Sequence, residues 1–228
     1  MSEAVRDPVV LAVDIGGSHV KILSSAGGVE RRAVSGPGMD AAAMVAAVEG
    51  LARDVTYDVI AMGYPGPVVH NRILSEPHNL APGWVGYDFG KRFGKPVRII
   101  NDALMQAIGS YQGERMLFLG LGTGLGAAMI VDKVAQPMEI AHLPYRKGRT
   151  YEDYLSEASL KKRGEDKWQH HVFKAVELLT AALEPDYVVI GGGNVRLLHE
   201  LPPKCRRGDN TDAFKGGFAL WLDRELRV

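Results

Sequence analysis

The chain has a single cysteine, no excess of charge of either sign and no long hydrophobic run. Cys205 alone cannot form an intramolecular disulfide or supply a zinc site that needs two or more thiolates. The 27 basic and 27 acidic side chains give a formal net charge of zero, which argues against a broad nucleic-acid interface because that surface needs a basic excess. The longest apolar runs, such as Pro8 to Val13, are too short to cross a bilayer. Residues 1–8 hold no apolar stretch typical of a secretory signal, so we expect a cytoplasmic protein without membrane or nucleic-acid partners.

The chain does have enough apolar material for a substantial core, since 46% of its 228 residues are hydrophobic. Apolar runs of strand length alternate with amphipathic segments of helical spacing. The expected helices lie at 40–54, with Asp40 near its start, and at 168–183; the expected strands include 59–62, 97–100 and 187–190. This alternation favours an α/β fold.

Two segments repeat the same pattern of apolar strand, glycine turn and apolar strand. Residues 9–23 read VVLAVDIGGSHVKIL, and residues 116–131 read MLFLGLGTGLGAAMIV. When the two segments are aligned with an offset of 106 residues, Asp14 matches Gly120 and Gly16 matches Gly122. This internal repeat indicates two similar lobes, although two unrelated glycine hairpins would show the same pattern. We expect an N-terminal lobe at 1–104 and a C-terminal lobe at 105–211, with a helix at about 212–228 packing back on the first lobe.

Three glycine-rich turns each follow a predicted strand. Glycine has no Cβ and tolerates positive φ, so backbone N–H groups in such turns approach anions closely. The sequence has no P-loop pattern, and the turn at Gly122 lacks the third glycine of a Rossmann fingerprint. Three turns therefore favour a polyphosphate held by the hairpins of two facing lobes. The residues expected to bind phosphate or nucleotide are Gly16, Gly17, Ser18, Gly122, Thr123, Gly124, Gly191, Gly192 and Gly193.

Two charged residues flank the first turn. The carboxylate of Asp14 would repel phosphate unless it holds Mg²⁺, directly or through water. The alternative is a turn aspartate that bonds its own backbone, and the pattern gives the two equal weight. Lys21, across the turn, is expected either to neutralise phosphate charge or to lie on the surface.

The candidate chemistry lies where polar residues follow the strand at 97–100. Asp102 would accept the proton of an alcohol during phosphoryl transfer, or would act as the N-cap of a helix at 103–111. Glu139, His142 and Glu152 supply the hydrogen-bonding groups that a sugar needs. Metal binding by these residues, or by His170 and His171, is the weaker alternative.

From about Val9 to the C-terminus, the order of these motifs resembles the ROK family of sugar kinases. The matching segments are DIGGSHVK at 14–21, PGP at 65–67, PHNLAPGW at 77–84, IND at 100–102, GLGTGLGAA at 120–128, EIAH at 139–142 and IGGGN at 190–194. The resemblance implies a duplicated actin-like ATPase (ribonuclease H-like) fold with two lobes and a cleft. It implies Asp102 as the catalytic base and sugar contacts from Gly66, Asn79, Asn101, Glu139 and His142.

Many members of the family carry a cysteine-rich zinc motif with a further sugar-binding glutamate. The matching stretch here, residues 150–154, has no cysteine, so Glu152 keeps the sugar role and zinc is lost. In this respect the chain is similar to the polyphosphate glucokinase branch. The resemblance implies a homodimer that phosphorylates glucose with Mg²⁺ and with polyphosphate, ATP or both.

The donor and the sugar stay open at this level. Basic clusters at 146–149, 161–163 and 204–207 would follow a polyanion, or form a solvated face. Mannose, an N-acyl hexosamine or non-catalytic sugar binding are the alternatives to glucose phosphorylation. The family's repressors carry a DNA-binding helix-turn-helix before the first phosphate motif, and the thirteen residues before Asp14 are too few for one.

Overall fold

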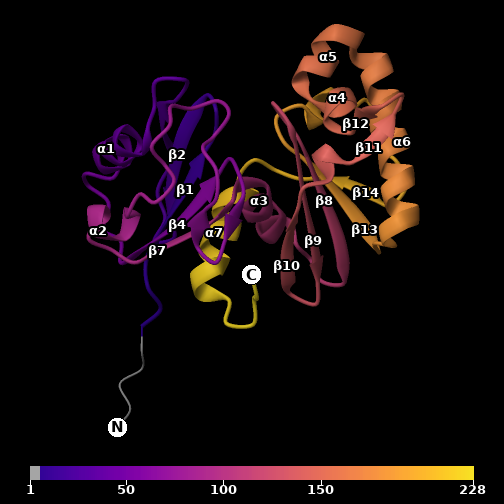
Figure 1. Cartoon of the computed structure of the whole chain (residues 1–228). Coiled ribbons are helices and arrows are strands. Elements are labelled where there is room, and N and C mark those ends of the chain that lie inside the picture. Colours follow the sequence, from indigo (N-terminus) through magenta and orange to yellow (C-terminus); the bar gives the residue numbers. More distant parts are fainter. Residues whose placement is uncertain (1–5) are drawn as a thin grey trace.

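The computed structural model describes residues 6–228 and contains two five-stranded sheets of the same strand order (Figure 1). The first sheet has the order β3-β2-β1-β4-β7. Its strands are β1 (Val10–Ile15), β2 (His19–Ser24), β3 (Arg31–Val34), β4 (Val59–Tyr64) and β7 (Val97–Asn101). The first three strands are antiparallel neighbours, and β4 and β7 run parallel to β1.

The second sheet repeats this arrangement with the order β10-β9-β8-β13-β14. Its strands are β8 (Arg115–Leu121), β9 (Leu125–Val131), β10 (Val134–Met138), β13 (Tyr187–Gly191) and β14 (Cys205–Arg207). Strands β8, β9 and β10 are antiparallel, and β13 and β14 run parallel to β8. The predicted duplication and fold class are therefore confirmed.

The two hairpins differ by one residue. Ile15 pairs with Val20 in the first, whereas Leu121 pairs with Leu125 in the second. The offset of 106 thus holds up to the turn and becomes 105 after it. The second turn is the tighter of the two.

Helices cover the outer face of each sheet. Helix α1 (Ala41–Leu51) is N-capped by Asp40, whose carboxylate accepts from the Ala43 N–H at 2.7 Å. It confirms the helix expected at 40–54, and its Met44, Val45 and Val48 are buried against the first sheet. The remaining elements of this half are α2 (Phe89–Phe93) and the hairpin of β5 (Val68–Val69) and β6 (Arg72–Ile73).

The long helix over the second sheet is α6 (Glu165–Leu183), which confirms the helix expected at 168–183 and buries Trp168, Val172 and Val176. Shorter elements precede and follow it. They are η1 (Ile140–His142), β11 (Pro144–Arg146), β12 (Arg149–Thr150), α4 (Glu152–Leu155), α5 (Glu157–Arg163) and η2 (Val195–Leu197). Among residues 6–228, no helix combines the length and apolar character needed to cross a membrane.

Helices α3 (Asp102–Ser110) and α7 (Asp212–Leu222) pack against each other between the two sheets (Figure 1). A Cβ on Gly216 would lie 1.8 Å from the Met105 carbonyl oxygen, so only glycine allows this crossing. Helix α7 also packs on the first sheet, where the Trp221 indole N–H donates to the Ile60 carbonyl at 3.1 Å. The division of lobes between 104 and 105 falls within α3 and stays a prediction.

Candidate active site

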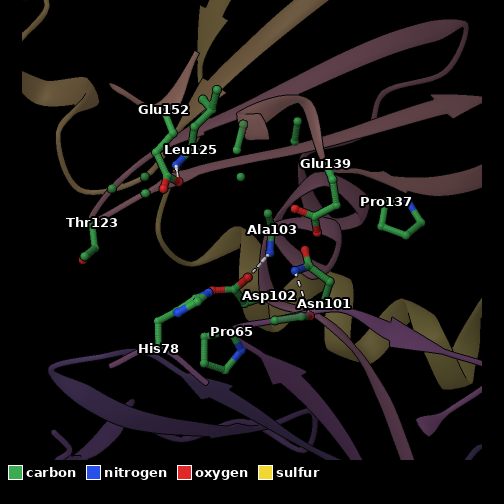
Figure 2. A pocket seen from close by; sticks show the side chains of 18 of the residues that line it. Pro65, His78, Asn101, Asp102, Ala103, Thr123, Leu125, Pro137, Glu139 and Glu152 are labelled. Carbon is green, nitrogen blue, oxygen red and sulfur yellow. Dashed lines mark hydrogen bonds between the residues drawn. The ribbon is translucent and has the colours of Figure 1, made fainter. Parts of the chain in front are cut away.

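A cavity of about 620 Å³ lies between the two halves of the molecule and receives residues from both (Figure 2). Both glycine turns reach it because β1 and β8 end at its wall. The sequence-predicted residues that line it are Gly16, Gly17, Gly66, Asn79, Asn101, Asp102, Gly122, Thr123, Gly124, Glu139, His142, Glu152 and Gly192. Residues up to 176 positions apart in sequence thus meet in one site.

The start of α3 positions the candidate base. Asn101 is the N-cap: its Oδ1 accepts from the Leu104 N–H at 3.0 Å and its Nδ2 donates to the Gly66 carbonyl at 3.2 Å. Asp102 is the first residue of the helix, and its carboxylate accepts from the Ala103 N–H at 2.7 Å. The alternative that Asp102 is the N-cap is therefore wrong. Asn101 fills that position, which leaves the Asp102 carboxylate in the cavity.

The surroundings of Asp102 raise the pKa of its carboxyl group towards neutral pH. Burial raises the pKa of its carboxyl group, and the negative charges of Asp14 and Glu139 raise it further. The Ala103 N–H opposes this shift, and the resulting pKa is about 7. A carboxyl group with this pKa gains and loses a proton readily at physiological pH, as a general base must.

Asp14 lies near the end of β1, just before the first turn, and is only 9% exposed. Burial raises the pKa of its carboxyl group, and the Lys21 ammonium partly offsets this. The two residues are register partners across the β1–β2 hairpin, with Lys21 Nζ 3.8 Å from Asp14 Oδ2.

The carboxylates of Asp14 and Asp102 are close enough for one charge to raise the pKa of the other group. Such a pair suits Mg²⁺, which binds one or two carboxylates and completes its coordination with water and substrate phosphates. Within residues 6–228, no group of three or more His, Cys, Asp or Glu side chains is arranged to hold a metal ion. Asp14 and Asp102 are the two residues here that could hold such a cation together with a substrate phosphate.

Glu139 and His142 face solvent at the cavity wall, with side chains that are 59% and 72% exposed. Their closest carboxylate and imidazole atoms are 3.7 Å apart. Both side chains leave most of their hydrogen-bonding capacity for a ligand.

Glu152 is the first residue of α4 and projects onto the β8–β9 turn (Figure 2). Its Oε2 accepts from the Leu125 N–H at 3.1 Å. A Cβ on Gly124 would lie 2.5 Å from this same oxygen, so glycine is needed for the contact. A carboxylate thus occupies a backbone donor of the turn that the sequence predicts as a phosphate site.

Five predicted residues do not line the cavity wall: Asp14, Ser18, Lys21, Gly191 and Gly193. Gly191 is buried with the Phe118 ring against it, whereas Gly193 has open space around it. Asn194, which follows, donates its side-chain amide to the Gly122 carbonyl at 3.2 Å and so fastens the third glycine run to the second turn. The phosphate-binding roles of these residues stay predictions.

Several lining residues were not predicted from the sequence, and among them His78 and Gln106 have polar side chains. In Figure 2 the His78 side chain points into the cavity on the side where Asp102 lies. Gln106 follows Asp102 by four positions on α3, a helical spacing that could have identified it. The other missed residues are Pro65, Pro67, Ala103, Gly120, Leu125, Gly126, Ala127, Pro137, Met138 and Ala141.

The loop that carries His78 and Asn79 is closed by Glu76. Its carboxylate accepts from the backbone N–H groups of residues 83, 84 and 85 at 2.9, 3.0 and 3.2 Å. These hydrogen bonds lower the pKa of Glu76. Glu76 therefore shapes the segment that presents His78 and Asn79.

Three comparisons relate the chain to known proteins. A search of curated proteins gave no match. Among solved structures, an inorganic polyphosphate/ATP-glucomannokinase from Arthrobacter sp. strain KM matches with a TM-score of 0.80 and 21% identity, over 96% of this chain and 100% of that one. A ROK family glucokinase from Streptomyces griseus, solved with glucose and AMPPNP, matches with a TM-score of 0.75 and 17% identity, over 94% and 99%. A ROK family transcriptional regulator, a homologue of the E. coli MLC protein, matches with a TM-score of 0.68 and 15% identity, over 95% and 78%.

At these identities the structural matches establish the fold. Family membership comes from the sequence comparison, in which the model of the ROK family matches residues 10–137, more than half of the chain. The matched range contains both glycine turns and Asp102. The chain therefore belongs to the ROK family.

Proposed function

We propose that this protein is a sugar kinase that transfers a phosphoryl group from polyphosphate or ATP to the 6-hydroxyl of glucose. The observation that carries the proposal is the carboxyl group of Asp102, whose pKa is about 7, in a cavity bounded by glycine turns of both halves. Transfer to an alcohol needs a base beside the hydroxyl and anion-binding groups beside the phosphates. This cavity brings the two together.

In the proposed reaction the Asp102 carboxylate accepts the proton of the sugar 6-hydroxyl. The oxygen forms a bond to the terminal phosphorus of the donor while the bond from that phosphorus to the bridging oxygen breaks, and the electron pair leaves with the remaining phosphate chain. The Ala103 N–H holds this carboxylate in place in the cavity. Closure of the two lobes would exclude water before transfer.

The other site residues would orient the two substrates. Asn101, Glu139 and His142 would bind sugar hydroxyls, together with Gly66, Asn79 and Glu152. The glycine turns would hold phosphates through backbone N–H groups, with Lys21 supplying positive charge. Mg²⁺ near Asp14 would neutralise charge on the transferring phosphoryl group. No zinc site is proposed.

The surface supports polyphosphate as a donor through two of the three basic clusters. In the third, the Arg206 guanidinium donates to the Ser110 carbonyl and Arg207 donates to the Leu198 carbonyl at 2.5 Å, so both stabilise the fold. By contrast, Arg146, Lys147 and Arg149 are exposed on the β11–β12 hairpin. Lys162 of the second cluster is exposed as well. These side chains could follow a long anion that leaves the cavity.

The experiment is to measure hexose 6-phosphate formation with Mg²⁺ and either ATP or polyphosphate as the only donor, using glucose, mannose and an N-acyl hexosamine as acceptors. We expect glucose 6-phosphate from the unmodified protein and none from Asp102→Asn. Asp132→Asn is the matched control, because Asp132 is exposed in the β9–β10 turn. Full activity of Asp102→Asn would overturn the assignment of the base.

Activity only with another hexose would correct the acceptor. Failure with every sugar and both donors would leave non-catalytic sugar binding as the function. Light scattering of the same sample tests the homodimer, and localisation of a tagged chain tests the cytoplasmic assignment.

A further inference from the structure

The β8–β9 turn already holds an anion that belongs to the protein. Glu152 Oε2 accepts from the Leu125 N–H at 3.1 Å and contacts Gly124. Carboxylates and phosphates compete for the same backbone donors, because each presents anionic oxygen acceptors of similar reach. A phosphate cannot use the Leu125 N–H while Glu152 occupies it.

The rest of the turn is fixed in place. The Gly122 carbonyl accepts from the Glu157 N–H at 3.0 Å and from the Asn194 side chain at 3.2 Å. The Gly122 N–H in turn donates to the Gly124 carbonyl at 3.1 Å. Because these bonds hold the loop, the Leu125 N–H becomes available only when the Glu152 side chain moves.

Glu152 has a second possible partner within the same cavity. Its side chain lines the same cavity as Asn101, Asp102, Glu139 and His142, where the proposed function places the sugar. A sugar hydroxyl is a good donor to a carboxylate and could draw it away from the turn. Glu152 Oε2 can accept a hydrogen bond from the turn or from the sugar, but it cannot hold the best geometry for both at once.

We infer that Glu152 makes binding of the phosphate donor depend on the sugar: without sugar it occupies the β8–β9 turn and weakens phosphate binding, and with sugar it releases the Leu125 N–H. This inference rests on the proposed kinase function and deepens it. Its consequence is selectivity for a sugar over water as the acceptor, since the donor binds well only when the alcohol is present. Glu152 thereby acts as a specificity-determining residue.

The test measures binding of inorganic tripolyphosphate with Mg²⁺ by calorimetry, with and without glucose, to the unmodified protein, Glu152→Gln and Glu152→Ala. In the absence of glucose we expect Glu152→Gln to bind tripolyphosphate about tenfold more tightly than the unmodified protein, because a charged hydrogen-bond acceptor becomes neutral. Glu152→Ala should bind at least as tightly. Glucose should tighten binding to the unmodified protein and have little effect on either variant.

Glu157→Gln is the matched control, since the Glu157 backbone N–H donates to the Gly122 carbonyl of the same turn while its carboxylate pairs with Lys161. An equal gain in affinity in this variant would overturn the inference, because general charge repulsion would then explain the result. The rate of phosphate release from tripolyphosphate without sugar should also rise in Glu152→Ala and stay low in Glu157→Gln.

The outcomes separate this inference from the proposed function. If the unmodified protein makes glucose 6-phosphate but Glu152→Gln and Glu152→Ala bind tripolyphosphate no better than it does, the inference alone fails. If neither the unmodified protein nor any variant binds tripolyphosphate, with or without glucose, the β8–β9 turn is not a phosphate site. The inference is then overturned, whereas the proposed function fails only if no hexose 6-phosphate forms with either ATP or polyphosphate.

Discussion

Replacing Asp102 by Asn should make the folded protein more stable at neutral and alkaline pH. The pKa of the carboxyl group is about 7 in the folded state, against 3.8 for an ordinary aspartate. Well below pH 3.8 the group is protonated in both the folded and the unfolded state, so it does not change the free energy of unfolding. As pH rises from about 4 to 7, the unfolded chain ionises first, so the wild-type protein loses stability. The difference is about three pH units at about 1.4 kcal/mol each, which gives an upper bound of about 4 kcal/mol, since partial exposure of the side chain reduces it.

Asparagine cannot ionise and keeps an oxygen that accepts from the Ala103 N–H, so the variant avoids this loss. The assay is urea unfolding followed by tryptophan fluorescence at several pH values between 4.5 and 8.5. The gain of Asp102→Asn over the wild-type protein should increase with pH and level off above about pH 7. Asp132→Asn should show no such trend, because Asp132 is exposed. A gain that does not vary with pH, or a loss of stability at pH 8, would refute the explanation that burial raises this pKa.

Three further predictions concern a helix crossing, a loop beside the cavity and the exposed basic side chains. Gly216→Ala should destabilise the protein by about 3 kcal/mol or more, because the new Cβ would lie 1.8 Å from a backbone oxygen of α3; Gly50→Ala, in open space on α1, should be neutral or stabilising in the same urea assay. Glu76→Gln should raise KM for the hexose, by up to about a hundredfold, with a smaller effect on kcat, because the loop of His78 and Asn79 loses its closing carboxylate; equal KM values would contradict this positioning role. Replacing Arg146 and Lys162 together by Ser should raise KM for long polyphosphate and flatten its salt dependence while leaving KM for ATP unchanged, and parallel changes for both donors would assign these side chains another role.

The sequence predicted the duplicated sheets because each hairpin carries its own local information. Apolar strands flank glycine turns at 16–17 and 122–124, and the second copy repeats the first at a nearly constant offset. The cavity could also be anticipated from the repeat. Each glycine turn follows the equivalent strand of its own sheet, so two lobes that face each other bring the two turns together. What these patterns encode is local backbone geometry, and that part of the prediction was confirmed.

The sequence could not decide which residue caps α3. Asn101 and Asp102 both have side chains that serve well as N-caps, and neighbouring positions point in different directions. The choice depends on where β7 ends, and β7 is held by its pairing with β4 up to Asn101. Because pairing with a distant strand extends β7 to Asn101, the Asp102 carboxylate enters the cavity and its pKa rises.

The contact between Glu152 and the β8–β9 turn shows a second limit of sequence patterns. A glycine turn after a strand predicts free backbone N–H groups, and both a phosphate and a carboxylate satisfy such donors. The pattern therefore predicts an anion site without identifying the anion. Glu152 lies 27 positions after Leu125, at the start of a four-residue helix with no periodicity of its own, so local patterns could not predict their hydrogen bond. Only the packing of α4 against the turn reveals that the protein supplies one anion itself, and any phosphate that uses this donor must displace it.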